Sequence, residues 1–409
     1  MSTEALRDLL RRTFAEACAS IDLRTSTRDT LPPIPPVSGR VVLVAVGKAA
    51  PAMAAGALDR WGSRIEEALV VTTDGTDVSC LEGRAEVLRA SHPLPDERSV
   101  HAAERALALV PSGPSDLLLA LVSGGASALL SAPPSGMSLD ELREVHTALL
   151  ASGLPIQRIN LVRRHLSRTQ GGRLALAAHP ARTLTLYASD IPQGEAFEIG
   201  SGPTIASPAD VEGARQVLAS VLPQDRAAQF APFLSPPLDA RSEEAALLEA
   251  RPIATPTTLA EAIATRLRSA GFSVRIGEER TAPAAPLVGE YAHLASTLAP
   301  RSALVVPCEP SLELPASTGR GGRAGWLALA LLPHLPSDVA FLAGASDGVD
   351  GHSGHAGACI GGDVAFDPGL VARALAAFDD APVHEALGTA LPGGPTGLNL
   401  TDVHVLARG

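Results

Sequence analysis

Continuous apolar strands separated by helices are the feature that most constrains the fold of this chain. Residues 41–46 (VVLVAV) carry only apolar side chains, which is typical of a parallel strand buried on both faces. The same pattern predicts strands at 68–73, 85–90, 116–122 and 183–189, and helices at 49–61, 96–110, 138–152, 156–169 and 207–221. This alternation predicts an α/β fold whose first domain is a doubly wound, Rossmann-like three-layer sheet.

The alternation resumes in the second half of the chain. Helices are expected at 258–270, 286–298 and 370–378, a Gly-rich loop followed by a helix at 318–332, and strands at 272–277, 303–307, 339–343 and within 393–405. Between the halves, residues 223–256 are rich in proline and poor in strand pattern, which indicates a boundary. We therefore expect two α/β domains, residues 1–235 and 236–409, with the active site in the cleft between them.

Composition excludes several classes of partner. A net charge of −11 argues against nucleic acid, and the apolar runs are far shorter than the ~20 residues of a membrane span. Residues 4–14 predict an amphipathic helix rather than a secretory signal, and the four cysteines form no CxxC pair. We expect a cytoplasmic protein, monomeric or homodimeric, that acts on a small molecule without a nucleic-acid or membrane partner.

One basic residue differs from all the others. Of the 33 basic residues only Lys48 is a lysine, and it follows the first buried strand directly after Gly47. Arginine replaces lysine easily as a surface charge but not as a compact point charge in a tight site. The alternative explanation is a compositional bias toward arginine that left one lysine by chance. We favour a functional role for Lys48.

Other chemistry-bearing residues follow the strands of the first half. Ligands of open α/β sheets bind beyond the carboxyl ends of the strands. Those ends are expected to carry Ser91 and His92, then Ser123 with a Gly-Gly pair, and then Asp190. A strand followed by Gly-Gly exposes backbone N–H groups to an anion, although a plain tight turn has the same sequence. The motifs G-x-x-x-x-G-K-[ST] and G-x-G-x-x-G are both absent.

The second half adds loops suited to phosphate and metal. Residues 319–323 (GRGGR) place two guanidinium groups beside flexible backbone before a helix, which suits phosphate, or forms an ordinary Arg-rich turn. The loop 346–351 holds Asp347 and Asp350 but lacks the remaining ligands of an EF-hand, so Mg²⁺ with phosphates is the better prediction. Basic groups, N–H-rich loops and spaced aspartates in both halves predict phosphoryl transfer.

The chain resembles the D-glycerate 2-kinases that combine a DUF4147 domain with a leucine-rich MOFRL domain, a family also described historically as hydroxypyruvate reductases. The matching segments run in family order along nearly the whole chain: 46–49 (VGKA), 91–96 (SHPLPD), 121–130 (LVSGGASALL), 159–167 (INLVRRHLS), 189–190, 200–204 (GSGPT), 319–323, 346–351 and 393–402. The resemblance implies two α/β domains and transfer of the γ-phosphoryl group of ATP, with Mg²⁺, to the 2-hydroxyl of D-glycerate or a close small hydroxy acid.

The resemblance also assigns residues. Lys48, Asp190 and Arg323 match the catalytic lysine, aspartate and arginine of the family. The candidate substrate- or nucleotide-binding residues are Ser91, His92, Ser123, Gly124, Gly125, Ser127, Arg164, Gly319, Arg320, Gly321, Gly322, Asp347, Thr396 and Asn399. The candidate metal ligands are Asp190, Glu309, Asp347 and Asp350.

This chain departs from the family pattern in four places. Ala324-Gly325-Trp326 stand for Asn-Gln-Glu, residues 193–195 (QGE) for a Gly-Asp pair, residues 307–309 (PCE) for Gly-Gly-Glu, and Gln170 for a lysine. The first change motivates a second hypothesis, a relative that binds nucleotide or a small carboxylate with little or no catalysis. A nicotinamide-dependent hydroxypyruvate reductase is the third, and the missing G-x-G-x-x-G counts against it.

Overall fold

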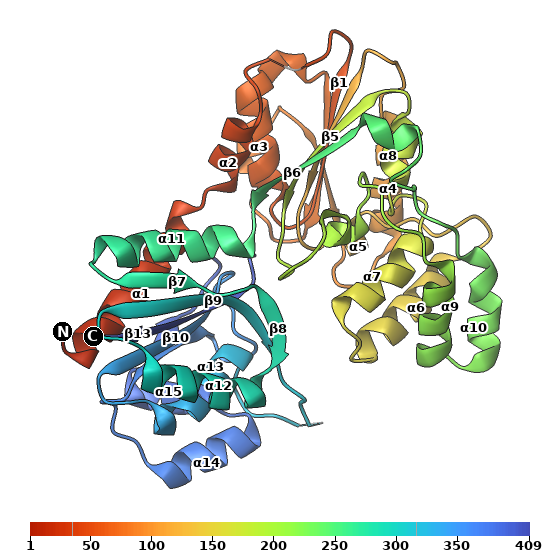
Figure 1. Cartoon of the computed structure of the whole chain (residues 1–409). Coiled ribbons are helices and arrows are strands. Elements are labelled where there is room, and N and C mark those ends of the chain that lie inside the picture. Colours follow the sequence, from red (N-terminus) through yellow and green to blue (C-terminus); the bar gives the residue numbers. More distant parts are fainter. Residues whose placement is uncertain (35, 316) are drawn as a thin grey trace. The chain divides into compact units, whose positions relative to one another are not determined.

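The computed structural model describes residues 1–34, 36–315 and 317–409, which form two compact units (Figure 1). Unit 2 comprises Leu23–Ser189 and Gly194–Ile253. Unit 1 comprises Met1–Asp22, Asp190–Gln193 and Ala254–Gly409. Sequence analysis divided the chain after residue 235. The structural division falls later because a further strand of the unit 2 sheet lies beyond that point, and the first 22 residues belong with the C-terminal part.

Unit 2 is built on a six-stranded sheet with the order β3-β2-β1-β4-β5-β6. The strands are β1 (Val41–Val46), β2 (Glu67–Thr73), β3 (Glu86–Ala90), β4 (Leu117–Val122), β5 (Arg182–Ala188) and β6 (Leu248–Ala254). The first five strands in this order, from β3 to β5, pair with their neighbours in parallel. Strands β1 and β4 are buried along their whole length. The predicted doubly wound sheet is confirmed.

Helices of unit 2 fall into two groups. Those associated with the sheet region are α2 (Leu23–Thr30), α3 (Ala50–Trp61), α4 (Glu97–Leu109), α5 (Ala126–Leu129) and α8 (Arg173–Ala178). The others, α6 (Leu139–Ala151), α7 (Ile156–His165), α9 (Val211–Val221) and α10 (Gln224–Phe230), pack around an apolar core of their own (Figure 1).

Two helix boundaries were mispredicted, whereas a third was right. The capping box of Ser138 and Glu141 starts α6 as expected. Helix α7 ends at His165, four residues before its predicted end. The prediction that Ser207 caps the next helix was wrong, because the side chain of Asp210 accepts the hydrogen bond from the Gly213 amide and starts α9 there.

Unit 1 contains a mixed sheet with the order β12-β11-β10-β13-β9-β7, and β8 pairs with β9. The strands are β7 (Ser273–Ile276), β8 (Arg280–Pro283), β9 (Ser302–Ser311), β10 (Val339–Ala345), β11 (His355–Gly361), β12 (Ala390–Pro392) and β13 (Asp402–Arg408). The helices are α1 (Thr3–Ser20), α11 (Pro256–Ser269), α12 (Ala284–Thr297), α13 (Arg323–Leu331), α14 (Pro368–Ala377) and α15 (Ala381–Leu387). β8, β11, β12 and α15 were not anticipated from the sequence.

Alternating residues of the unit 1 strands cover the two faces of the sheet. Phe341 and Leu406 pack with α12 and α13 in the main apolar core, while α1 contacts α11, β10 and β11. Helix α1 confirms the predicted amphipathic N-terminal helix. Its Phe14 ring packs so closely on Gly344 that a Cβ added to this glycine would lie only 2.8 Å from the ring. None of the described helices is both long and apolar enough to cross a membrane.

Candidate active site

The strand order of unit 2 reverses at β1, which lies between β2 and β4. The loops after β1 and β4 therefore meet at the edge where ligands of such sheets bind. Hydrogen bonds join them: the Ser123 amide donates to the Val46 carbonyl (3.0 Å), and the Lys48 amide donates to the Gly124 carbonyl (2.9 Å). The Ser123 hydroxyl accepts from the Ala49 amide (3.1 Å), so this predicted binding side chain holds the two loops together.

Lys48, His92 and Gly125 come together at this edge. Gly125 has a φ of +92°, and a Cβ there would lie 3.3 Å from His92 Cδ2 and 3.5 Å from Lys48 Cγ. Both the backbone conformation and the crowding require glycine at this position. Lys48 is exposed and forms no ion pair within the described parts of the chain. Three residues that are far apart in the sequence thus form one group, as the sequence analysis expected for their strands.

The loop after β4 supplies unused backbone donors. Residues 1–34, 36–315 and 317–409 provide no acceptor for the amides of Gly124 and Gly125. Consecutive free amides beside a lysine form an environment that favours an anion. We call the amides of Gly124 and Gly125, together with Lys48 and His92, the anion site.

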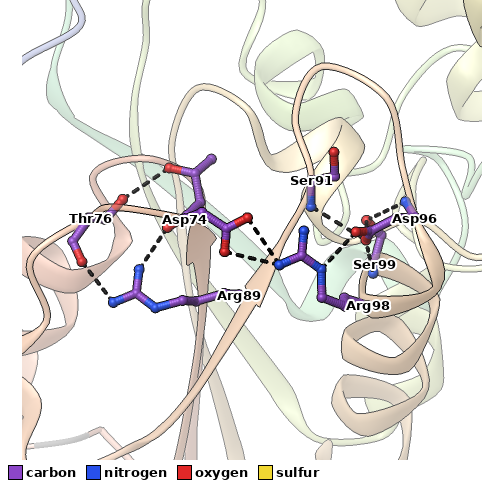
Figure 2. Close-up of polar contacts among 8 residues, drawn as sticks. Asp74, Thr76, Arg89, Ser91, Asp96, Arg98 and Ser99 are labelled. Atoms are coloured by element: carbon purple, nitrogen blue, oxygen red, sulfur yellow. Dashed lines mark hydrogen bonds and ion pairs between the residues drawn. The ribbon is translucent and has the colours of Figure 1, made fainter.

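A polar network holds the loop that carries Ser91 and His92 (Figure 2). Asp96 caps helix α4 and also accepts a hydrogen bond from the Ser91 amide (3.4 Å). Arg98 links Asp96 to Asp74, and Arg89 binds the carbonyls of the preceding turn. The Ser91 backbone therefore serves to fix the turn from which His92 projects.

The imidazole of His92 is neutral at neutral pH. Desolvation, followed by the positive charges of Lys48 and Arg163, lowers the pKa of His92 to about 4. A neutral ring donates one hydrogen bond and accepts another, so it is able to orient a ligand without adding charge. Arg163 was not among the site residues predicted from the sequence.

Two further predicted residues of unit 2, Ser127 and Arg164, are buried. Ser127 is buried, and its hydroxyl lies 2.8 Å from that of Ser201. Gln170, which stands for the family's lysine, donates to the Ser127 carbonyl at 2.6 Å. Arg164 is buried with its guanidinium carbon 4.8 Å from the centre of the Phe197 ring. Ser127 and Gln170 thus support the loop from inside.

Unit 1 gathers its own set of predicted residues at one edge of its sheet. Strand β13 runs antiparallel to both β9 and β10, so the ends of β9 and β10 and the start of β13 share that edge. Asn399 donates to Asp190 (2.8 Å), and the Thr396 amide donates to the Asp347 carbonyl (3.2 Å). The structure therefore brings Asp190, Asp347, Thr396 and Asn399 into one cluster of loops.

Arg323 is held between two carboxylates. Its Nε and Nη2 donate to Asp402 (2.8 and 3.3 Å), and its Nη1 donates to Glu309. Burial opposes the charge, but Asp402 and Glu309 outweigh it and raise the pKa of Arg323. Three of the five guanidinium N–H groups are used within the described residues, which leaves two for a ligand. Asp402 was missed from sequence, because only the sheet register places it here.

The loop before α13 is closed by protein carboxylates. Asp350 is 2% exposed and accepts from the amides of Ala324 (3.1 Å) and Gly325 (2.8 Å). The Gly322 amide donates to Asp380, the Gly319 amide to a backbone carbonyl, and Arg320 donates to Asp379 and Glu385. The expected phosphate cradle of residues 319–322 is thus largely occupied by the chain itself, and Asp350 acts as a helix cap.

Comparison with known proteins decides the family. Residues 6–230 match the family described as "Domain of unknown function (DUF4147)", and residues 302–402 match the MOFRL family. A solved glycerate kinase from Thermotoga maritima superposes with a TM-score of 0.86 at 28% identity, covering 99% of this chain and 100% of that one. The chain belongs to the glycerate 2-kinase family. The resemblance noted in the sequence is confirmed.

Relatives of this glycerate 2-kinase family member carry two kinds of name. A "Putative hydroxypyruvate reductase" of Agrobacterium vitis is 37% identical over 98% of this chain and 94% of that protein. A "D-glycerate 2-kinase" of Thermotoga maritima is 36% identical over 53% of this chain and 51% of that protein. The names differ in reaction class, so the site itself has to distinguish them.

The structure explains why this member departs from the family at 324–326. Ala324 is fully buried, and a Cβ on Gly325 would lie 2.2 Å from Asp380 Oδ2. Trp326 donates to the Leu375 carbonyl (3.1 Å) and stacks on Phe378. The three residues pack into unit 1, and glycine is needed at 325 to make room for the Asp380 carboxyl group.

Magnesium fits the donors available in this member. Within the described residues no three His, Cys, Asp or Glu side chains converge as in an all-protein metal cage. Mg²⁺ needs fewer protein ligands, because it is commonly held by one or two carboxylates together with substrate phosphates. Glu309 is bound to Arg323 and Asp350 caps a helix. Asp190 and Asp347 are therefore the better donors among the four predicted metal ligands.

Proposed function

We propose that this chain transfers the γ-phosphoryl group of ATP to the 2-hydroxyl of D-glycerate or a close small hydroxy acid. The observation that carries the proposal is the anion site: Lys48 without an ion pair, beside the free amides of Gly124 and Gly125. Such a site suits phosphate oxygens, and phosphoryl transfer depends mainly on positioning and charge stabilisation. The solved relative named a glycerate kinase supports the same reaction.

Three residues carry the chemistry in this proposal. Lys48 offsets the negative charge of the transferring phosphoryl group as a compact point charge. Asp190, oriented by Asn399, accepts the proton of the acceptor hydroxyl. Arg323, fixed by Asp402 and Glu309, uses its two remaining N–H groups to bind a carboxylate or phosphate oxygen.

Magnesium is proposed to accompany the nucleotide. Asp190 and Asp347 would hold it, and when bound it would neutralise charge on the donor phosphates. The half-buried Asp347 is fixed by hydrogen bonds from Thr396 to the Ser346 and Asp347 carbonyls (2.5 and 3.2 Å), and its carboxylate accepts from the Val349 amide (2.9 Å).

Reduction of hydroxypyruvate by a nicotinamide cofactor is the second candidate, because the Agrobacterium vitis relatives carry that putative name. Dinucleotide-binding domains of this strand order carry G-x-G-x-x-G in the first βα turn, where the glycines let the pyrophosphate approach the backbone. Here that turn reads Gly47-Lys48-Ala49, and its Lys48 amide is bonded to Gly124. The turn favours the kinase.

One assay separates the candidates. The purified chain is incubated with ATP, Mg²⁺ and a panel of small hydroxy acids, with ADP release followed and products identified by NMR; a parallel series contains hydroxypyruvate with NADH or NADPH. We expect ADP release that depends on D-glycerate and is lost in Lys48→Met. Cofactor oxidation without ADP release would assign the reductase reaction instead. Nucleotide binding without either reaction would assign the binding-only relative.

A further inference from the structure

Helix α7 carries two consecutive buried arginines with unsatisfied donors. Arg163 is 7% exposed and Arg164 is 5% exposed. Within the described residues, Nε of Arg163 and both Nε and Nη1 of Arg164 have no acceptor. The one side-chain hydrogen bond of Arg163 is a long contact from Nη1 to Asn160 (3.4 Å). Buried guanidinium groups are ordinarily paired, so this pair of residues requires an explanation.

The two arginines face different surroundings. Arg164 lies against the Phe197 ring; burial lowers its pKa, and the charge of Glu198 opposes that effect. The positive charge of Arg163 instead lowers the pKa of both His92 and His146. Successive residues of a helix point about 100° apart, which accounts for the difference. Of the two arginines, Arg163 is therefore the one whose charge acts on His92, a member of the anion site.

No negative charge compensates Arg163. Burial alone lowers its pKa to about 10, with no contribution from a carboxylate, and the group stays protonated at neutral pH. Hydrogen bonds link it to the loop after β4: Asn160 Oδ1 accepts from Arg163 and from the Ser201 hydroxyl, which lies 2.8 Å from the Ser127 hydroxyl, just after the free amides of Gly124 and Gly125. A buried cation without a partner is energetically unfavourable, and a bound anion removes that penalty.

We propose that Arg163 binds an oxyanion of a substrate, together with Lys48 and the amides of Gly124 and Gly125. The oxyanion is either the carboxylate of the hydroxy acid or the terminal phosphate of ATP, because both offer paired oxygens that suit a guanidinium group. The identity of the substrate rests on the proposed function. The anion-binding role itself does not require turnover.

Binding of inorganic phosphate tests the site without catalysis. Thermal unfolding is measured against phosphate concentration, with KCl keeping the ionic strength constant, for the wild type, Arg163→Gln and Arg173→Lys. Arg173 is the matched control, because its guanidinium is spent on the carbonyls of Arg164, Gln170, Ser235 and Pro236.

We expect phosphate to raise the unfolding temperature of the wild type. Arg163→Gln should weaken the phosphate affinity about 10- to 100-fold, the scale of a lost hydrogen bond to a charged group. Arg173→Lys should lower the unfolding temperature and leave that affinity unchanged. Equal phosphate affinity in the wild type and Arg163→Gln, or no phosphate effect on the wild type, overturns the proposal. If the glutamine variant does not fold, Arg163→Lys replaces it, with a smaller expected loss.

Steady-state kinetics then identify which anion Arg163 binds. A higher KM for D-glycerate with an unchanged KM for ATP assigns the carboxylate, and the reverse pattern assigns the phosphate. Unchanged KM values for both substrates overturn the proposal while the kinase function stands. A chain that shows no phosphoryl transfer but loses phosphate binding in Arg163→Gln would contradict the kinase function and leave the anion site intact.

Discussion

At the scale of single residues, position 48, which holds the one lysine of the chain, has the strictest requirement for a particular side chain. A Cβ added to Gly125 would lie 3.5 Å from Lys48 Cγ. The Lys48 amide donates a hydrogen bond to the Gly124 carbonyl in the neighbouring loop. The larger planar head of arginine does not reproduce the point charge of an ammonium group. Charge alone is therefore not sufficient here; its compactness matters too.

Lys48→Arg is expected to fold normally and to lose kcat about 10²-fold or more, the scale of one removed electrostatic contact to the transition state. The reciprocal control is Arg40→Lys, at an exposed arginine paired with Glu66 and Glu67, which should leave kcat unchanged. Thermal unfolding accompanies the kinetics of both variants. Turnover of Lys48→Arg near that of the wild type would show that the single lysine is a compositional accident.

Asp190 is expected to act as the general base. Asp190→Asn keeps the hydrogen bond from Asn399 through its remaining oxygen, so the fold should be retained. The kcat should fall about 10²-fold or more, with little change in KM for ATP. The measurement is kcat and both KM values at several Mg²⁺ concentrations. Recovery of activity at high Mg²⁺ would instead make Asp190 a metal ligand without a role in proton transfer.

At the scale of elements, helix α13 begins at an unusual pair of buried acids. Asp350 caps the helix, while Asp380 is 1% exposed, accepts from the Gly322 amide and has no partner for Oδ2 within the described residues. Burial, and then the charge of Asp350, raise the pKa of Asp380 to about 7. Above that pH Asp380 adds a buried negative charge beside the Asp350 carboxyl group, whose own pKa burial also raises.

The pH dependence of stability follows from this pair. Between the ordinary carboxyl pKa near 4 and about 7, the folded chain binds a proton at Asp380 that the unfolded chain has lost, so stability falls as pH rises through that range. Asp380→Asn should raise the unfolding temperature of unit 1 at pH 8 and change it little at pH 5. Glu313→Gln, at an exposed carboxyl group of the same unit, is the control. Parallel curves for the wild type and Asp380→Asn would contradict the assignment.

The accuracy of prediction differed between elements for physical reasons. Buried parallel strands such as β1 and β4 were recognised because both faces need apolar side chains. Strand β11 was not predicted because its sequence, HAGACIG, is short and glycine-rich and contains only one β-branched residue, an isoleucine. The proximity of Lys48, His92 and Gly125 was predictable because all three follow parallel strands of one sheet. Nothing local in the sequence distinguishes Arg163 or Asp402, because burial and sheet register give them their surroundings.

At the scale of the whole molecule, the chain does not build its units in sequence order. Helix α1, at the N-terminus, belongs to unit 1, where Thr3 donates to the Ser337 carbonyl (2.6 Å) and Phe14 packs on Gly344. Strand β6, beyond residue 247, joins the sheet of unit 2 next to β5. A cut at the proline-rich stretch near residue 235 therefore leaves both units incomplete.

Fragments of the chain test this assignment. The fragment 23–253 is expected to be monomeric and to unfold cooperatively, because it contains all but the last residue of the six-stranded sheet. The fragment 1–235 lacks β6 and exposes the apolar face of α1, where Leu6, Leu10 and Phe14 each contribute roughly 1.5–3 kcal/mol when buried. It should aggregate or unfold at a lower temperature, as measured by circular dichroism and size-exclusion chromatography. A fragment 1–235 more stable than 23–253 would mean that α1 stabilises unit 2 and that β6 is dispensable, contrary to the division seen in the structure.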